Sequence, residues 1–221
     1  DGTGSVNYAQ TGLRWNYGAD GQSFQKGDQI EVSVHAIEMV YIPEGAFHLG
    51  SGGNESAHFY KYPTETDTYV VTSEAAIDVG TTNGMYYTPG GEYGDGAGPI
   101  PADFPKGYAA FYCMKYEISQ GQYADFLNKL TSAQATARYP NYFGQYRYTI
   151  HYDSLSGKYI ADAPDRACNW LNWADGAAYA DWACLRPMTE LEFGKACRGT
   201  EAPVPNEYAW GTTTISAPTA I

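Results

Sequence analysis

The part of the sequence richest in chemically active side chains is residues 185–199, LRPMTELEFGKACRG. Groups of acids, arginines and thiols like this one often mark catalytic sites. The spacing also has a structural explanation, because Thr189 and Glu192 form the T-x-x-E pattern of a helix capping box. We therefore predict a helix that begins at Thr189, and buried or half-buried ion pairs of Arg186 and Glu190 that hold it against the domain. The residues expected to face the core are Leu191, Ala196 and Cys197.

Metal and nucleophile motifs are the next candidates for chemistry. The histidines are far apart in sequence and form no H-E-x-x-H pair, so a metal site built from them would need distant segments to meet. The cysteines contain no C-x-x-C pair, which disfavours a zinc or thioredoxin-type site and leaves free thiols or a structural disulfide as alternatives. The sequence has no G-x-S-x-G, Walker or dinucleotide-binding motif. The residues concerned are His35, His48, His58 and His151, and Cys113, Cys168, Cys184 and Cys197.

Two acidic, glycine-rich loops remain as candidates for a calcium ion. They lie at Asp20-Gly21 and at residues 91–98, GEYGDGAG. Oxygen-rich loops suit calcium, but neither loop has the D-x-D-x-D-G spacing of a dedicated calcium site. Calcium therefore stays a candidate ligand without a motif to support it.

Composition limits the partners. The 221 residues carry a net charge of −12 and no basic run, which excludes nucleic acid and anionic membrane surfaces as expected partners. No apolar stretch approaches the roughly 20 residues of a membrane span. The 21 Tyr and 25 Gly, together with few Lys, are typical of secreted and surface proteins. The sequence begins at Asp1 rather than Met, which favours a processed or excised segment.

Periodicity predicts the elements of the first half. Residues 1–28 are polar and glycine-rich and are interpreted as a linker or the end of a preceding module, so the domain is expected over residues 29–221. Alternating apolar residues predict strands at residues 30–34, 39–42 and 47–49, with the last two joined as a β-hairpin. Residues 52–107 are too long for an ordinary loop and are interpreted as an ordered insertion with short strands.

The second half favours helices. Residues 111–118 predict a strand, and Ser119 with Gln122 has capping-box spacing at the start of a helix. Residues 132–165 are interpreted as a second surface excursion that contains a hairpin. A further helix is predicted after Asn172, with Asp175 at its third position. The residues expected to share its inner face are Trp173, Ala177, Ala180 and Cys184.

Aromatic residues gather in the second excursion. Exposed tyrosines make good recognition surfaces because they bury much area at a low cost in entropy. Packing of these rings onto the core explains the same pattern equally well. The candidate recognition residues are Tyr142, Phe143, Tyr146 and Tyr148.

Three blocks occur in the order and spacing of one known family. They are EMVYIPEGAFHLGS at 38–51, FYCMKYEISQGQYADFLN at 111–128, and CNWLNWADGAAYADWACLRPMTELEFGKACRG at 168–199, followed by YAWG at 208–211. They are similar to the blocks of the formylglycine-generating enzyme, or sulfatase-modifying factor, family. The resemblance implies an α+β, C-type-lectin-like fold with little regular secondary structure. Its motif positions are Tyr116, Glu117, Trp173, Asp175, Trp182, Arg186, Thr189, Glu190, Glu192 and Cys197.

The sequence departs from the family pattern at two places. The family's R-L-P-T-E is replaced by Arg186-Pro187-Met188-Thr189-Glu190, and the catalytic cysteine pair and calcium loops of the family follow the point at which this sequence stops, Ile221. None of the four cysteines matches a catalytic position, and Cys197 matches a cysteine whose disulfide partner would lie in the second half of the domain. The resemblance thus implies the N-terminal half of a domain, which a missing C-terminal half or a second chain would complete.

Two functions follow as hypotheses. The first is a non-catalytic secreted or surface module of a larger bacterial protein, such as an adhesin or filament subunit, without a cofactor and with a protein, a glycan or its own copies as partner. The second, implied by the resemblance, is copper-dependent oxidation of a client-protein cysteine to formylglycine, with the copper-binding cysteines in the missing half. A related iron-dependent sulfur-transfer enzyme would need histidine ligands that are not evident.

Overall fold

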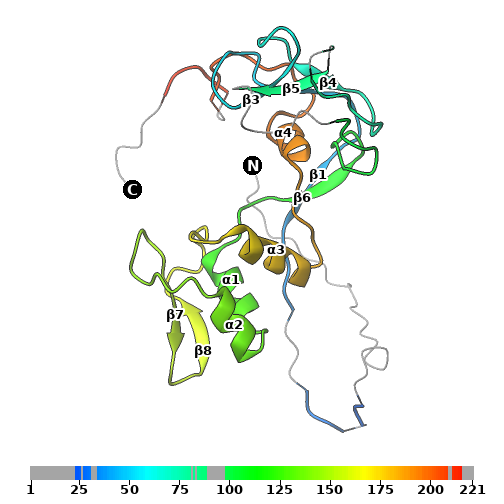
Figure 1. Cartoon of the computed structure of the whole chain (residues 1–221). Coiled ribbons are helices and arrows are strands. Elements are labelled where there is room, and N and C mark those ends of the chain that lie inside the picture. Colours follow the sequence, from blue (N-terminus) through cyan, green and yellow to red (C-terminus); the bar gives the residue numbers. More distant parts are fainter. Residues whose placement is uncertain are drawn as a thin grey trace. The chain divides into compact units, whose positions relative to one another are not determined.

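The computed structural model describes residues 23–25, 27–30, 34–80, 82, 84–88, 98–208 and 211–215 (Figure 1). The chain divides into a unit of residues 1–36 and a unit of residues 37–221. Asp20-Gly21 and residues 91–97 of the other calcium candidate lie outside the described residues, as do residues 31–33 of the first predicted strand. Ile30 and Val34, which are described, do not belong to a strand.

The helices confirm the predicted caps. Each of the four helices in the described part begins at a complete capping box, in which the cap side chain and the third helical residue bond each other's backbone amides. Helix α2 follows from a T-x-x-Q signal at residues 131–134 that the sequence analysis missed. The helices are α1 Gln120–Leu127, α2 Ser132–Arg138, α3 Trp173–Trp182 and α4 Glu190–Arg198.

The described strands form two-stranded antiparallel sheets. The predicted strands at residues 39–42 and 47–49 exist, but the hairpin between them is wrong, because each pairs with a strand from further along the chain. The amide of Gly45, in the predicted turn, donates instead to the carbonyl of Tyr108 at 3.0 Å. The pairs are β1 Met39–Ile42 with β6 Phe111–Met114, β2 Phe47–Leu49 with β4 Tyr69–Val71, β3 His58–Lys61 with β5 Met85–Thr88, and β7 Ile150–Asp153 with β8 Lys158–Ala161.

The insertion and the second excursion contain the elements expected of them. Short strands β3, β4 and β5 lie within residues 52–107, and the hairpin β7–β8 lies within residues 132–165 and packs against α1 (Figure 1). The chain is therefore of mixed α and β structure with short elements, as predicted. No helix among the described residues is long and apolar enough to span a bilayer.

Two hydrophobic clusters hold these elements together. One joins α1, α3 and the β7–β8 hairpin around Tyr123, Phe126 and Tyr179, and the other joins β2 and β4 to α4 through Leu191. Tyr148, predicted as part of a recognition surface, is completely buried in the first cluster. That prediction is wrong for Tyr148 because the chain turns inward between exposed Tyr146 and buried Ile150.

Two buried tyrosines should respond oppositely to loss of the hydroxyl. The Tyr123 hydroxyl donates to the carbonyl of Arg138 at 2.7 Å, whereas the Tyr148 hydroxyl is buried without a hydrogen-bond partner in the described part. An unpaired buried hydroxyl costs free energy, so Tyr148→Phe should raise the free energy of unfolding by about 1 kcal/mol. Tyr123→Phe should lower it by about 1 kcal/mol. Urea unfolding of both variants checks this, and equal losses of stability would show that the Tyr148 hydroxyl is paired.

Candidate functional site

The stretch that first suggested catalysis is a structural clamp at the start of α4. Glu192 is 2% exposed, and its carboxylate accepts hydrogen bonds from both terminal nitrogens of Arg186, at 2.8 and 2.6 Å, and from the Thr189 amide at 2.9 Å. Burial disfavours the charged carboxylate, but the bonds from Arg186 and Thr189 outweigh it and lower the pKa of Glu192. The acid is thus held ionised as part of the scaffold.

Helix α3 begins in the same way. The buried carboxylate of Asp175 accepts from the Asn172 amide at 3.1 Å and from the Arg138 guanidinium at 3.2 Å. Helices α3 and α4 thus both begin at a cap whose acidic side chain also binds an arginine from outside the helix. The role of Arg138 was missed, because its partner lies far along the chain and no local pattern marks it.

Two expectations for α4 are wrong. Glu190 is exposed and has no ion pair among the described residues, since the buried carboxylate of Glu192 binds Arg186 instead. Cys197 is also exposed, and Lys195 takes an inner position at 1% exposure. The Lys195 ammonium donates to the carbonyls of Gly107, at 2.6 Å, and Tyr108, at 3.1 Å. The inner face of α4 therefore combines Leu191 with two buried charged residues.

The loop under α4 fits it closely. Gly107 has a φ of +84°, and a β-carbon there would lie 3.1 Å from the Cα of Glu192, so glycine is required at this contact. The Thr189 hydroxyl accepts from the Glu192 amide at 3.1 Å and donates to the carbonyl of Pro105 at 2.9 Å. The two bonds fix both the helix start and its position on the loop.

Removal of the Thr189 hydroxyl should therefore lower the free energy of unfolding, because this hydroxyl has a structural and not a catalytic role. Thr189→Ala loses the cap and leaves the Pro105 carbonyl unpaired, which together should cost about 1–2 kcal/mol. Thr189→Ser keeps both bonds and serves as the control. Thermal unfolding of the two variants measures the difference, and equal melting temperatures for Thr189→Ala and the parent chain would refute the cap.

The other motif positions are scattered. The Trp182 ring packs on Phe126 and Tyr179, at 5.6 and 5.7 Å between centroids, and belongs to the first cluster. Tyr116 and Glu117 are exposed, and the Lys115 ammonium lies 5.2 Å from the Tyr116 ring. These positions therefore do not converge on one site.

The predicted inner face of α3 is not covered. Trp173, Ala177, Ala180 and Cys184 all line an open groove of about 840 Å³, and Trp173 is 75% exposed. The buried face of α3 instead carries Asp175 and Tyr179. We call this hollow the apolar groove; its further walls include Met39, Phe111, Tyr112, Met114, Leu171, Gly176 and Met188. An open hollow of this size lined mainly by apolar side chains is typical of a binding site.

The described thiols do not form a copper centre. Burial raises the pKa of Cys168 to about 12. The residue Cys197 is exposed, but partial shielding of its thiol from water, with Glu190 and Cys113 nearby, raises its pKa as well. Thiolates bind copper and act as nucleophiles, and these surroundings favour the neutral thiol. The four cysteines are free, and no group of three or more His, Cys, Asp or Glu in the described part is placed to hold a metal. The described residues thus do not themselves form a copper site, which the resemblance places in the second half of the domain.

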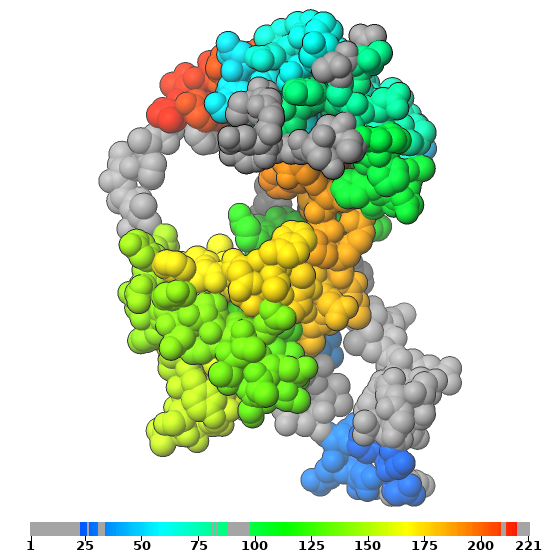
Figure 2. All heavy atoms as spheres, in the orientation of Figure 1, coloured from blue at the N-terminus to red at the C-terminus, as the bar shows by residue number. Residues whose placement is uncertain are grey.

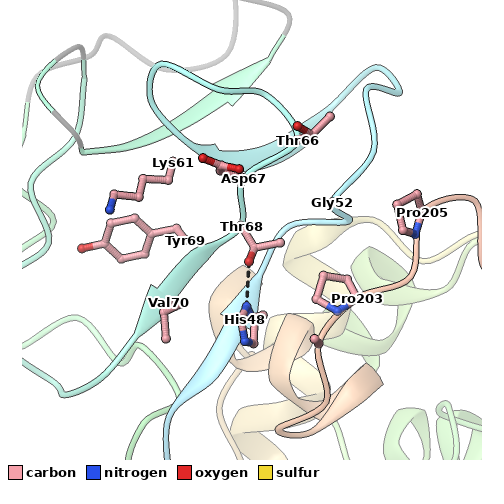
Figure 3. A pocket seen from close by; sticks show the side chains of 11 residues that line it. His48, Gly52, Lys61, Thr66, Asp67, Thr68, Tyr69, Val70, Pro203 and Pro205 are labelled. Atoms are coloured by element: carbon pink, nitrogen blue, oxygen red, sulfur yellow. Dashed lines mark hydrogen bonds between the residues drawn. The ribbon is translucent and has the colours of Figure 1, made fainter.

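A second hollow is polar. It has a volume of about 770 Å³ and lies between β2, β4 and the segment around Pro203 and Pro205 (Figure 3). His48 and Thr68 face each other across the β2–β4 pair, with 2.6 Å between the His48 Nδ1 and the Thr68 hydroxyl. Lys61 lies on the same side as Tyr69 and away from the histidine in Figure 3, so the polar groups of this hollow do not converge on one point.

The exposed aromatic surface exists without Tyr148 and with an added tryptophan. Trp170 stacks on Tyr142, with 4.2 Å between ring centroids, and lies 5.6 Å from the ring of Tyr146, which is 80% exposed. Phe143 is also exposed and packs against His151. The yellow-green segment that carries Tyr142, Phe143 and Tyr146 lies on the surface in Figure 2. Trp170 was missed because it follows a different segment of the sequence.

The backbone under this aromatic surface is held in an uncommon conformation. Tyr146 and Trp170 have φ values of +45° and +65°, in the left-handed region that non-glycine residues rarely adopt. The Asn169 amide group donates to the Tyr146 carbonyl at 3.0 Å and ties the two segments together. Such strained positions gather at functional sites, which supports a binding role for these rings.

Comparison with known proteins identifies the family. The model of the FGE-sulfatase family, described as the Sulfatase-modifying factor enzyme 1-like domain, matches residues 25–220. No curated protein and no solved structure matches the chain. The match spans the Arg186–Glu192 clamp, both capped helices α3 and α4, and the apolar groove. The chain therefore belongs to the FGE-sulfatase family of Sulfatase-modifying factor enzyme 1-like domains.

Proposed function

We propose that this chain is a non-catalytic binding or assembly module of a larger secreted or cell-surface protein, built on the lectin-like scaffold of its family. The observation that carries the proposal is the apolar groove, because a helix face that the sequence marks as core is exposed there. In soluble proteins, a large apolar surface that the chain itself leaves uncovered usually marks the contact with a partner. The proposed partner is polypeptide, either the remainder of the domain or a second chain.

The chemically active residues support the same proposal. Glu192, Arg186 and Asp175 are occupied with capping and clamping helices. The raised pKa values of Cys168 and Cys197 are opposite to those of a catalytic thiol. The residues of this chain that resemble catalytic groups therefore serve its architecture.

The surface composition favours an extracellular setting. The net charge of −12 keeps the module away from anionic partners, and the exposed aromatic surface of Tyr142, Phe143, Tyr146 and Trp170 offers a second contact area for a protein or glycan. A scaffold with a packed core and long surface loops suits such a role.

The oxidase activity of the family is the hypothesis to exclude. The full-length protein that contains this chain is purified and incubated with copper, oxygen and a C-x-P-x-R peptide, and mass spectrometry measures conversion of the peptide cysteine. We expect no conversion above that produced by copper and oxygen alone. Conversion that requires the protein would refute the non-catalytic proposal.

A further inference from the structure

We propose that the apolar groove receives an extended strand from a second copy of this chain, formed by residues 29–36, QIEVSVHA, so that copies join head to tail. The inference rests on the proposed assembly function and names its partner. Addition of an extended segment to a free sheet edge is a common mode of polypeptide recognition.

The groove follows a free edge of β6. The Lys115 amide donates to the carbonyl of Glu38 at 3.0 Å, and these residues continue the register in which Met39 faces Met114. Hydrogen-bonded and non-bonded pairs alternate along an antiparallel ribbon, so the amides and carbonyls of Tyr112 and Met114 point away from β1. They have no backbone partner in another described segment. All residues of β6 line the groove, but only Met39 of β1 does.

The opposite wall admits a close backbone. Gly176, Ala177 and Ala180 of α3 have small side chains, and a β-carbon built at Gly176 meets nothing within 4 Å. Trp173 and Met188 offer apolar contacts beside this space. A two-stranded ribbon is marginally stable alone, and a third strand at β6 would complete its hydrogen bonds and cover the exposed face of α3.

Residues 29–36 have the pattern of such a strand. Ile30, Val32 and Val34 alternate with polar residues, which places β-branched side chains on one face. Ile30 is 48% and Val34 67% exposed, so neither side chain is used in the core of its own chain. One chain thus carries both an apolar strand pattern whose described members, Ile30 and Val34, are exposed, and an apolar groove beside a free edge.

The same chain cannot supply this strand to its own groove. A strand that adds to β6 in antiparallel fashion runs parallel to β1, and parallel strands of one sheet need a connection of about a dozen residues or more. Only residues 35–37 separate Val34 from Glu38, which is already paired with Lys115. The donor therefore comes from another copy. Because donor and groove are different surfaces, the contact is heterologous and extends into chains or rings.

Each half of the contact can be removed separately. Ile30→Asp with Val34→Asp puts charges on the donor at exposed positions, so the fold should be unaffected. Gly176→Leu fills the groove from a position that is open in the free chain. Gly176→Ala is the matched control, and it should also stabilise α3 by about 0.5–1 kcal/mol in thermal unfolding, because alanine favours helix over glycine.

Sedimentation velocity across a range of concentrations tests the contact. The parent chain and Gly176→Ala should form species larger than dimers, and the donor and groove variants should each associate roughly 30-fold more weakly or worse. An equimolar mixture of the two variants should form dimers and nothing larger, because it contains one intact donor and one intact groove per pair. A synthetic peptide of residues 29–36 should dissociate the parent assemblies, which tests the groove without any substitution.

Some results would overturn the contact. They are a parent chain that stays monomeric at every concentration, a Gly176→Leu variant that assembles like the parent, or a mixture that stays monomeric. Because peptide oxidation is measured separately, its occurrence would refute the proposed function, whereas a monomeric parent chain refutes only the strand contact.

Discussion

Replacement of Glu192 by alanine should lower the free energy of unfolding by about 3 kcal/mol. The carboxylate is buried and accepts three hydrogen bonds, from two nitrogens of Arg186 and from the Thr189 amide. Its removal leaves the arginine without its anion and the amide without a partner, and it opens a cavity. The Arg186 side chain is 55% exposed, so water recovers part of its solvation, and we therefore expect a value at the lower end of the range for broken buried pairs.

Glu190→Ala is the matched control for this prediction. It removes the same charge from the first turn of the same helix, but Glu190 is exposed. Its cost should stay below about 0.5 kcal/mol. Urea unfolding at neutral pH measures both variants, and equal losses of stability would show that only the helix dipole, and not the clamp, depends on these acids.

The clamp also predicts an acid dependence. The pKa of Glu192 is lowered in the folded chain from its ordinary value of 4.5, so the folded state holds the proton less tightly than the unfolded state. Its contribution to stability is fully present above pH 4.5 and is lost as the pH falls through the folded pKa. The parent chain should therefore lose more stability than Glu192→Ala over this range.

Alkaline conditions should unfold the chain cooperatively above pH 10. Burial raises the pKa of Tyr123 and of Tyr148 far above the ordinary value of 10.0, and both side chains are fully buried. The folded state binds these protons more tightly, so the contribution of the two tyrosines to stability is complete below pH 10 and falls above it. Above pH 10, each tyrosine lowers the free energy of unfolding by about 1.4 kcal/mol per pH unit. For both tyrosines this amounts to roughly 5 kcal/mol by pH 12.

Deprotonation of Lys195 changes the free energy of unfolding in the opposite direction, over a lower pH range. Burial lowers its pKa from 10.5, so stability rises as the pH increases through the folded pKa and stops rising above 10.5. The loss from the tyrosines continues beyond that point and dominates. Tyrosinate absorbance and circular dichroism should change together, and Tyr148→Phe should make the fall of stability above pH 10.5 less steep by about 1.4 kcal/mol per pH unit. Ionisation of all tyrosines in a folded chain would contradict the prediction.

The sequence predicted what local spacing determines. The caps at Ser119, Asn172 and Thr189 are confirmed because a capping box depends on residues three apart. Strand pairing was not predictable, since β1 finds its partner β6 across the whole insertion and no local pattern records that choice. The same limit hid Arg138, which reaches Asp175 from a helix far along the chain.

Burial was harder to predict than secondary structure. The apolar face of α3 was identified correctly, but periodicity cannot show whether another element covers that face, and Trp173 is exposed. Tyr146 and Tyr148 look alike in sequence, yet a left-handed turn at Tyr146 and Arg147 sends one outward and the other into the core. Lys195 illustrates the reverse error, because backbone carbonyls allow a lysine to occupy a core position.

The proposed assembly depends on the free edge of β6. Hydrogen–deuterium exchange at the Tyr112 and Met114 amides, measured at low and high concentrations of the parent chain, tests this directly. Strand addition predicts exchange that is fast in the monomer and slows by about tenfold or more on assembly, and that stays fast in Gly176→Leu. Exchange at these two amides that is already slow in the monomer, or that does not change with concentration, would contradict the account of the groove as the assembly site.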